Sequence, residues 1–289
     1  MASIMKSETL AGSASSQAVE EFLELYVREP ALVFQALAEG GDDLNPLFVQ
    51  AVLADRDCFS HLCDGRILTL AAATKVAGIL RARGANFELM LARQAARWSV
   101  EPRMASKIVR ALQILDEAGK DTRISSVVWK LARSGNSMIR SRAWHLIARC
   151  SPSDIPLGSY LADEDPRVTA NVIEGLLKSN ADPAWIGRIV TECAGHGNNR
   201  VAANAIVGLY RMGEGAHAVV LIRRMTGDER ALFRSSAAWA MGRMAGAGLR
   251  EDLNRLRQDP SHVVRWSALR SLIRLQKEGK TGQNEEKAA

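Results

Sequence analysis

Hydrophobic residues recur with a helical period along most of the chain. The pattern is clearest from Asp165, where DPRVTANVIEGLLKS places Val168, Val172 and Leu176 four residues apart. At about 100° per residue, positions 0, 4, 7 and 8 fall on one face of a helix. Alternation with a period of two, which would predict strands, is nearly absent. The pattern therefore predicts an all-α protein.

The same pattern occurs seven times. Its first core residue recurs at spacings of 32, 35, 29, 33, 32 and 31 residues, at Ala72, Met104, Ile139, Val168, Val201, Phe233 and Val264. The residues four and eight positions later are apolar in every copy. Further amphipathic segments lie between the copies, over 87–98, 124–131, 185–193 and 249–256. Two helices in each repeat predict a stack of α-hairpins.

The repeats divide the chain into four parts. We expect a disordered N-terminal segment over 1–16 and a helical cap or degenerate repeats over 17–70, with helices at 18–27, 31–40 and 45–55. The repeat array then occupies 71–276, with an irregularity near Pro156. The polar segment 277–289 is expected to be disordered.

Several short motifs resemble a known type of repeat. DPRV from Asp165, VVR from Val263, MGRMAG from Met241 and LYRMG from Leu209 are similar to the short HEAT repeats named after phycobilisome lyases. The resemblance covers 70–276. It implies an α-α superhelix, a right-handed solenoid in which the second helix of each hairpin lines a concave surface. It says little about function, because this family includes scaffolds, a few lyases and a few nucleic-acid enzymes.

The second helices carry many cations at positions that the pattern predicts to be exposed. The candidate partner-binding residues are Lys75, Lys107, Arg110, Arg142, Arg149, Lys178, Arg211, Trp239, Arg243, Trp266, Arg270 and Arg274. On a concave surface they would form a basic row that suits an acidic protein segment or a phosphate backbone. The alternative is that the cation ten residues into each repeat belongs to the repeat pattern itself and binds helix-end carbonyls.

Composition narrows the possible partners and surroundings. The net charge is +6, which favours acidic partners but is also ordinary for a soluble domain. The four cysteines form no CxxC motif, so we expect reduced thiols and no metal site. The chain has no apolar run of about 18 residues, so we expect a cytoplasmic protein with no membrane span. Its oligomeric state is not indicated.

The sequence offers little support for an enzyme or a cofactor. It has no His-Glu pair of the kind that binds di-iron, no P-loop, no dinucleotide-binding motif and no GxSxG motif. A DNA glycosylase-like site would need an aromatic residue beside a carboxylate, yet Glu174 and Trp239 stand two repeats apart. For a bilin lyase no anchoring residue can be named. The favoured function is a non-catalytic scaffold or adaptor for a protein with an acidic surface, and the alternative is a nucleic-acid-binding solenoid.

The sequence also predicts where the histidines and tryptophans lie. We expect the histidines at the surface or at helix caps: His61, His145, His196, His217 and His262. Trp98, Trp129 and Trp185 fall on apolar stripes and are expected in the core.

Overall fold

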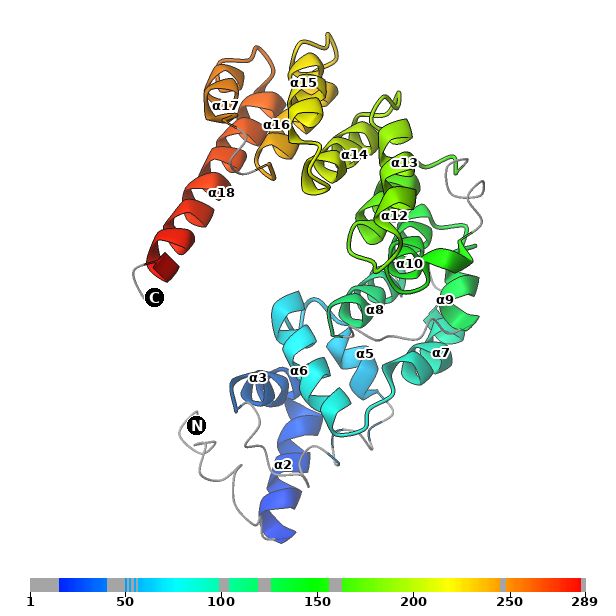
Figure 1. The fold of residues 1–289 in the computed structure, drawn as a ribbon. Helices are drawn as coiled ribbons and strands as arrows, with labels where there is room; N and C mark the ends of the chain where they lie inside the picture. Colours follow the sequence, from blue (N-terminus) through cyan, green and yellow to red (C-terminus); the bar gives the residue numbers. More distant parts are fainter. Residues whose placement is uncertain are drawn as a thin grey trace. The chain divides into compact units, whose positions relative to one another are not determined.

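A computed structural model describes most of the chain. The described residues are 16–40, 50, 52, 55, 57–98, 104–118, 126–155, 163–244 and 248–286, and the side chains of 16–19, 40, 96–97, 118 and 278–286 are not described. All regular structure in these residues is helical, so the protein is all-α as the sequence predicts (Figure 1). The chain divides into two compact units, Met1–Leu146 and Ile147–Ala289, which we call unit 1 and unit 2 and describe separately.

Unit 1 is built from helices that pack in sequence order. In this unit α2 packs on α3, α3 on α6, and α6 on α8, while α7 contacts α5, α8 and α9. The helices are α2 (Ser16–Arg28), α3 (Pro30–Gly40), α5 (Cys58–Leu62), α6 (Leu70–Ala82), α7 (Phe87–Trp98), α8 (Ala105–Ala118), α9 (Ser126–Leu131) and α10 (Ser137–Cys150), the last of which continues into unit 2. Proline stands at the start of α3, where the first turn needs no backbone donor.

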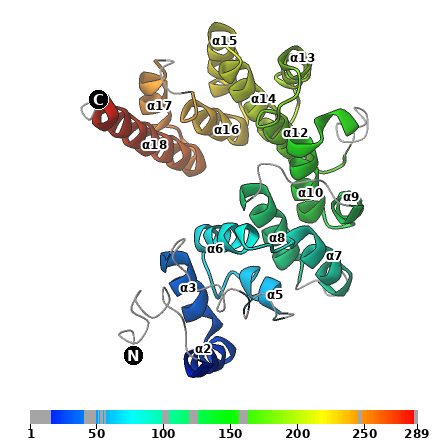
Figure 2. The same ribbon diagram turned by 60° about the horizontal axis from the view of Figure 1, so that its bottom comes forward.

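Unit 2 has two rows of helices. After the 3₁₀ turn Pro152–Asp154 come α12 (Pro166–Leu176), α13 (Pro183–Cys193), α14 (Asn199–Arg211), α15 (Gly215–Thr226), α16 (Ala231–Met241), α17 (Arg250–Leu256) and α18 (His262–Glu286). The even-numbered helices pack in order, α12 on α14, α14 on α16 and α16 on α18. The odd-numbered helices form the second row, with α13 and α15 against α14 and α17 against α18 (Figures 1 and 2).

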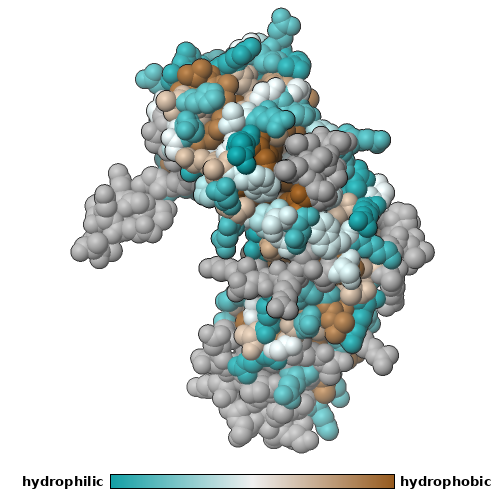
Figure 3. Space-filling model, turned by 45° about the vertical axis from the view of Figure 1, so that its right-hand side comes forward, coloured by the Kyte–Doolittle hydropathy of each residue, from teal (hydrophilic) through white to brown (hydrophobic). Residues whose placement is uncertain are grey.

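The core follows the predicted apolar stripe. The residues four positions into the repeats are all buried: Val76, Ile108, Ala143, Val172, Ala205, Ala237 and Ala268. Burying a side chain the size of Val or Ile contributes about 1.5–3 kcal/mol, so this stripe is a main source of stability. The intervening helices add Phe87, Leu91, Val128, Val190 and Leu253. The face of the molecule shown in Figure 3 is mainly hydrophilic, with separate hydrophobic areas.

One hydrogen bond recurs before five helices and shows that these segments share a local structure. In each, an acceptor five residues before the first core residue receives the backbone N–H two positions later, at 2.8–3.2 Å. The acceptors are Ser134, Asp163, His196, Asp228 and Asp259. Such local side-chain acceptors favour a turn over continued helix, so each helix begins at the same place in its repeat.

Three arginines stabilise the same turns. Arg140, Arg234 and Arg265 each follow the first core residue, and each donates to the carbonyls six and five residues earlier, at 2.7–3.2 Å. The arginine that follows the first core residue therefore satisfies loop carbonyls that the helix leaves without a donor.

The structure differs from the predicted boundaries at the C-terminal end. Residues 277–286 were expected to be disordered, but α18 continues to Glu286. No proline interrupts this segment, and extending an existing helix adds a backbone hydrogen bond per residue without a new nucleation step. The expected disorder over 1–15, most of the helix at 45–55 and the irregularity at Pro156 lie outside the described residues.

Candidate functional site: a cationic groove in unit 2

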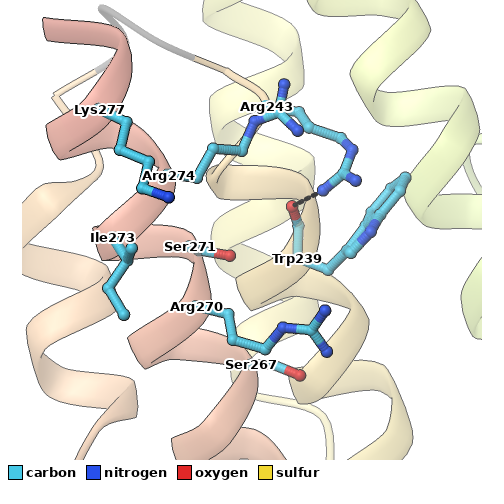
Figure 4. Close-up of a pocket in the computed structure, with 8 residues that line it drawn as sticks. All are labelled: Trp239, Arg243, Ser267, Arg270, Ser271, Ile273, Arg274 and Lys277. Carbon is cyan, nitrogen blue, oxygen red and sulfur yellow. Dashed lines mark hydrogen bonds between the residues drawn. The ribbon is translucent and has the colours of Figure 1, made fainter. Parts of the chain in front are cut away.

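A groove runs between α16 and α18. It has a volume of about 650 Å³ and is lined by Trp239, Arg243, Ser267, Arg270, Ser271, Ile273, Arg274 and Lys277. Four of these residues are cationic, and none of the described residues that line the groove is Asp or Glu. Figure 4 shows Arg270 and Arg274 reaching from α18 towards α16. The groove is therefore a concentration of positive charge on one face of unit 2.

The approach of α16 and α18 depends on small residues. A Cβ atom built at Gly242 would lie 2.6 Å from the Cβ of Ser271, so only glycine fits there. The hydroxyls of Ser235 and Ser267 are hydrogen-bonded at 2.7 Å across the same pair of helices. These contacts fix the spacing at which the cations of α18 face the aromatic residue of α16.

Trp239 and Arg243 form one rigid element of the groove wall. The Arg243 guanidinium carbon lies 3.8 Å from the centre of the Trp239 ring, and Arg243 Nη1 donates to the Trp239 carbonyl at 3.3 Å (Figure 4). The stacking contact and the hydrogen bond together fix the direction of the Arg243 side chain along the groove wall.

A second groove adjoins the first and has different chemistry. It shares Trp239 and Ser267 with the first, and its other polar lining residues are Asn171, Glu174, Asn199, Arg200, Asn204, Ser235 and Ser236. Asn199 Nδ2 donates to Ser236 Oγ at 2.6 Å, and Asn204 Nδ2 donates to the Ala170 carbonyl at 2.8 Å. The two grooves together offer a cationic end beside a mostly neutral polar surface.

The structure gathers only some of the predicted partner-binding residues of unit 2. Trp239, Arg243, Arg270 and Arg274 share the cationic groove. Lys178, just after α12, forms an ion pair with Glu174 of that helix at 3.1 Å. Arg211 is exposed at the end of α14, Arg149 is half-buried, and Trp266 is exposed on α18 outside the groove-lining set.

In unit 1, two of the predicted cations have structural contacts instead. Lys107 Nζ donates to Ser60 Oγ at 2.9 Å and lies 3.7 Å from Asp64 Oδ2. Arg110 donates to the carbonyls of Leu62 and Leu68, at 3.3 and 2.6 Å. Both therefore hold the segment after α5, because its backbone acceptors lack helical partners. Of the other two, Lys75 is exposed on α6 and Arg142 is half-buried on α10.

The expected surface position of His145 is wrong. Its side chain is 1% exposed, and Nε2 lies 3.1 Å from Asp116 Oδ2 of α8. A polar ring can be buried here because it has a carboxylate partner. Among the predicted tryptophans, Trp98 is buried as expected, while Trp129 and Trp185 are half-buried.

Sequence reasoning missed Lys277 and Ile273 as members of the groove. Lys277 was assigned to the disordered tail, but it follows Arg270 and Arg274 by seven and three residues on a continuous helix. That spacing places the three cations on one face and was the available signal.

The described residues include neither a membrane-spanning helix nor a metal-binding cluster. None of the described helices is long and apolar enough to cross a membrane. No cluster of His, Cys, Asp and Glu in the described part of the chain could hold a metal ion.

Comparison with known proteins does not assign the chain to a family. No protein-family model matches the chain, and no curated protein sequence matches it significantly. The function must therefore be argued from the groove itself.

Proposed function

We propose that the protein is a non-catalytic binding module of HEAT-like repeats, and that unit 2 binds an acidic segment of a partner protein in the α16–α18 groove. The observation that carries this proposal is the set Arg243, Arg270, Arg274 and Lys277 around Trp239, with no carboxylate among the described lining residues. A groove lined by several cations attracts anionic partners and accelerates their association. Arginine suits carboxylates in particular, because its planar donors match both oxygens.

The distribution of charge favours a protein segment over a nucleic acid. A phosphate backbone is best bound by cations repeated along its path. Here the adjoining groove is lined mainly by amides and hydroxyls, with one cation, Arg200, and one carboxylate, Glu174, which pairs with Lys178. Trp239 carries Arg243 on its ring, which leaves less aromatic surface for stacking bases. Ile273 instead offers an apolar contact beside the cations.

A binding experiment with two probes tests the proposal. The first probe is a fluorescein-labelled peptide with alternating acidic and leucine residues, and the second is a labelled oligo(dT). We expect the peptide to bind at low salt, and the paired change Arg270→Glu and Arg274→Glu to weaken binding by about tenfold or more. The matched control is Arg211→Glu, an exposed arginine of the same unit outside the groove-lining residues, which should leave peptide binding unchanged.

Either of two results would overturn the proposal. One is peptide binding that Arg270→Glu with Arg274→Glu does not weaken. The other is tighter binding of oligo(dT) than of the peptide, with an affinity that falls steeply as salt rises, which identifies a nucleic-acid-binding protein.

A further inference from the structure

The exposed face of α18 carries an apolar stripe. Trp266 is 59% exposed and Ile273 is 46% exposed, and Val263 and Leu269 are also exposed. The opposite face of the helix, with Val264 and Ala268, is fully buried. A large aromatic and several aliphatic side chains on one exposed face are typical of a surface that another helix covers.

The repeat register shows what kind of contact this stripe offers. On α16, Ser235 and Gly242 contact the next helix, through the hydroxyl of Ser267 and the close approach to Ser271. Counted from the first core residue of each copy, these two positions correspond to Trp266 and Ile273 on α18. Trp266 and Ile273 therefore occupy the two positions that, in α16, contact the following helix of the row, and no described helix follows α18 to cover them.

The earlier copies show how this position is normally filled. It holds Ala170 in α12, Ala203 in α14 and Ser235 in α16, where a successor helix packs closely. Both alanines are buried. The last copy has tryptophan instead, which projects too far for the same close approach but supplies a large contact area to a helix from outside.

The positive charge around the stripe favours a partner helix with acidic residues. Between His262 and Lys277, α18 contains three arginines and one lysine and no carboxylate. Arg270 and Lys277 are exposed beside Ile273 on the same face. A second α18 would oppose like charges, so a symmetric pairing of this helix with itself is disfavoured. The stripe suits an amphipathic helix with acidic residues beside its apolar face.

The first described helix of this chain has that chemistry. On α2, Leu23 is 37% exposed and Val27 is 82% exposed, one turn apart. Glu20 and Glu24 are exposed one turn apart on the same side of the helix. The other face of α2, with Phe22 and Tyr26, is buried in unit 1, so the acidic apolar face is held outward.

We propose that α2 of one copy packs on α18 of a second copy. In this contact Leu23 and Val27 pack against Trp266 and Ile273. Glu20 and Glu24 then lie near Arg270 and Lys277. The contact is head-to-tail: each copy offers one α2 and one α18, so copies join either in a closed ring or in an open chain. A contact limited to one pair of helices is small, and its exposed ion pairs are screened by salt, so the association is weak and salt-sensitive. The contact shares Arg270, Ile273 and Lys277 with the groove of the proposed function, but it is tested through Val27 and Trp266, which lie outside the groove-lining residues, so the two proposals fail separately.

Sedimentation velocity of the full chain tests the inference. We expect the average mass to rise from that of the 31.5 kDa monomer as concentration increases to about 10–100 µM, and to fall back in about 0.5 M salt. Val27→Asp and Trp266→Asp should each abolish this rise. The matched control is Val220→Asp on α15, an apolar residue that is 65% exposed and lies on neither face, which should associate like the wild type. Circular dichroism checks that each variant keeps its helix content.

Mixing the two defective variants gives the sharpest test. The Val27→Asp chain keeps an intact α18 and the Trp266→Asp chain keeps an intact α2, so the mixture should form 1:1 dimers and nothing larger. Three results would overturn the inference: a wild-type chain that stays monomeric at every concentration, association that only one of the two changes abolishes, and a mixture that stays monomeric although the wild type associates.

Discussion

The guanidinium of Arg234 donates to both carboxylate oxygens of Asp259, at 2.7 and 3.0 Å, and ties the start of α16 to the loop before α18. Because these hydrogen bonds favour the ionised carboxylate, the pKa of Asp259 lies below its ordinary value. Hydrogen bonds from Arg230 likewise lower the pKa of Asp228 to about 2. The stability of the turns before α16 and α18 therefore depends on pH.

These pKa shifts predict a loss of stability in acid. A carboxyl with a lowered folded-state pKa contributes its stability above the unfolded-state pKa and loses it as the pH falls through the folded-state pKa. We expect the urea midpoint to be steady near neutral pH and to fall between roughly pH 4 and pH 2. Asp259→Asn should lower the midpoint at neutral pH and reduce its dependence on acid pH. Two parallel pH curves would contradict this explanation.

The close approach of Gly242 to Ser271 predicts a strong effect of a single methyl group. A Cβ at this glycine would meet both the side chain and the backbone of Ser271, so α16 and α18 must separate. We expect Gly242→Ala to destabilise the protein by about 1–3 kcal/mol in urea unfolding followed by circular dichroism. Gly78→Ala in α6 is the control: nothing lies within 4 Å of its Cβ position, and it should stabilise by about 0.5–1 kcal/mol. Equal effects at the two glycines would count against the packing argument.

Arg110 should behave as a structural residue rather than a binding residue. Arg110→Met keeps the aliphatic stem but leaves the carbonyls of Leu62 and Leu68 without this donor, so we expect a loss of about 1–3 kcal/mol. Lys75→Met, at an exposed position of the same predicted row, should change stability by less than about 0.5 kcal/mol. Peptide binding to unit 2 should be the same in both variants. If Arg110→Met had normal stability but bound the peptide less tightly, Arg110 would instead be a partner-binding residue.

The buried thiols should react slowly in the folded protein. Burial raises the pKa of Cys58 to about 12 and that of Cys193 to about 11, and it also raises the pKa of Cys63. At about pH 8 almost none of these groups is thiolate, which is the reactive form. We expect Ellman's reagent to leave all three unmodified on a timescale of minutes and to react fully after denaturation in urea. Rapid reaction of Cys58, Cys63 or Cys193 in the native state would show that its surroundings open easily.

Periodicity located the core and most of the helices, although it did not predict α5 or α15. The stripe from Val76 to Ala268 was predicted from spacing and is buried throughout, because a helix repeats its faces locally whatever it packs against. The same local information could not decide the state of each charged side chain. Lys107 and Arg110 share a face with exposed cations, but their partners lie more than forty residues away in sequence.

Helical register predicted the cationic groove only in part. Trp239, Arg243, Arg270 and Arg274 were chosen from their register and lie together, while Lys277 was missed because the end of α18 was placed too early. Lys178 was chosen on the same grounds, but it lies just after α12 and pairs with Glu174 of that helix. Helical register predicts which way a side chain points, but not which neighbouring group it pairs with.

The sequence by itself determined that the chain is helical and which residues of the stripe face the core, because these follow from a period of 3.6 residues. Only the tertiary structure decided that His145 is buried against Asp116 and that Arg234 binds Asp259, because long-range pairing depends on elements brought together by packing. The exposure of Trp266 has the same origin, since its register position is covered in earlier copies by a successor helix that no described element provides after α18.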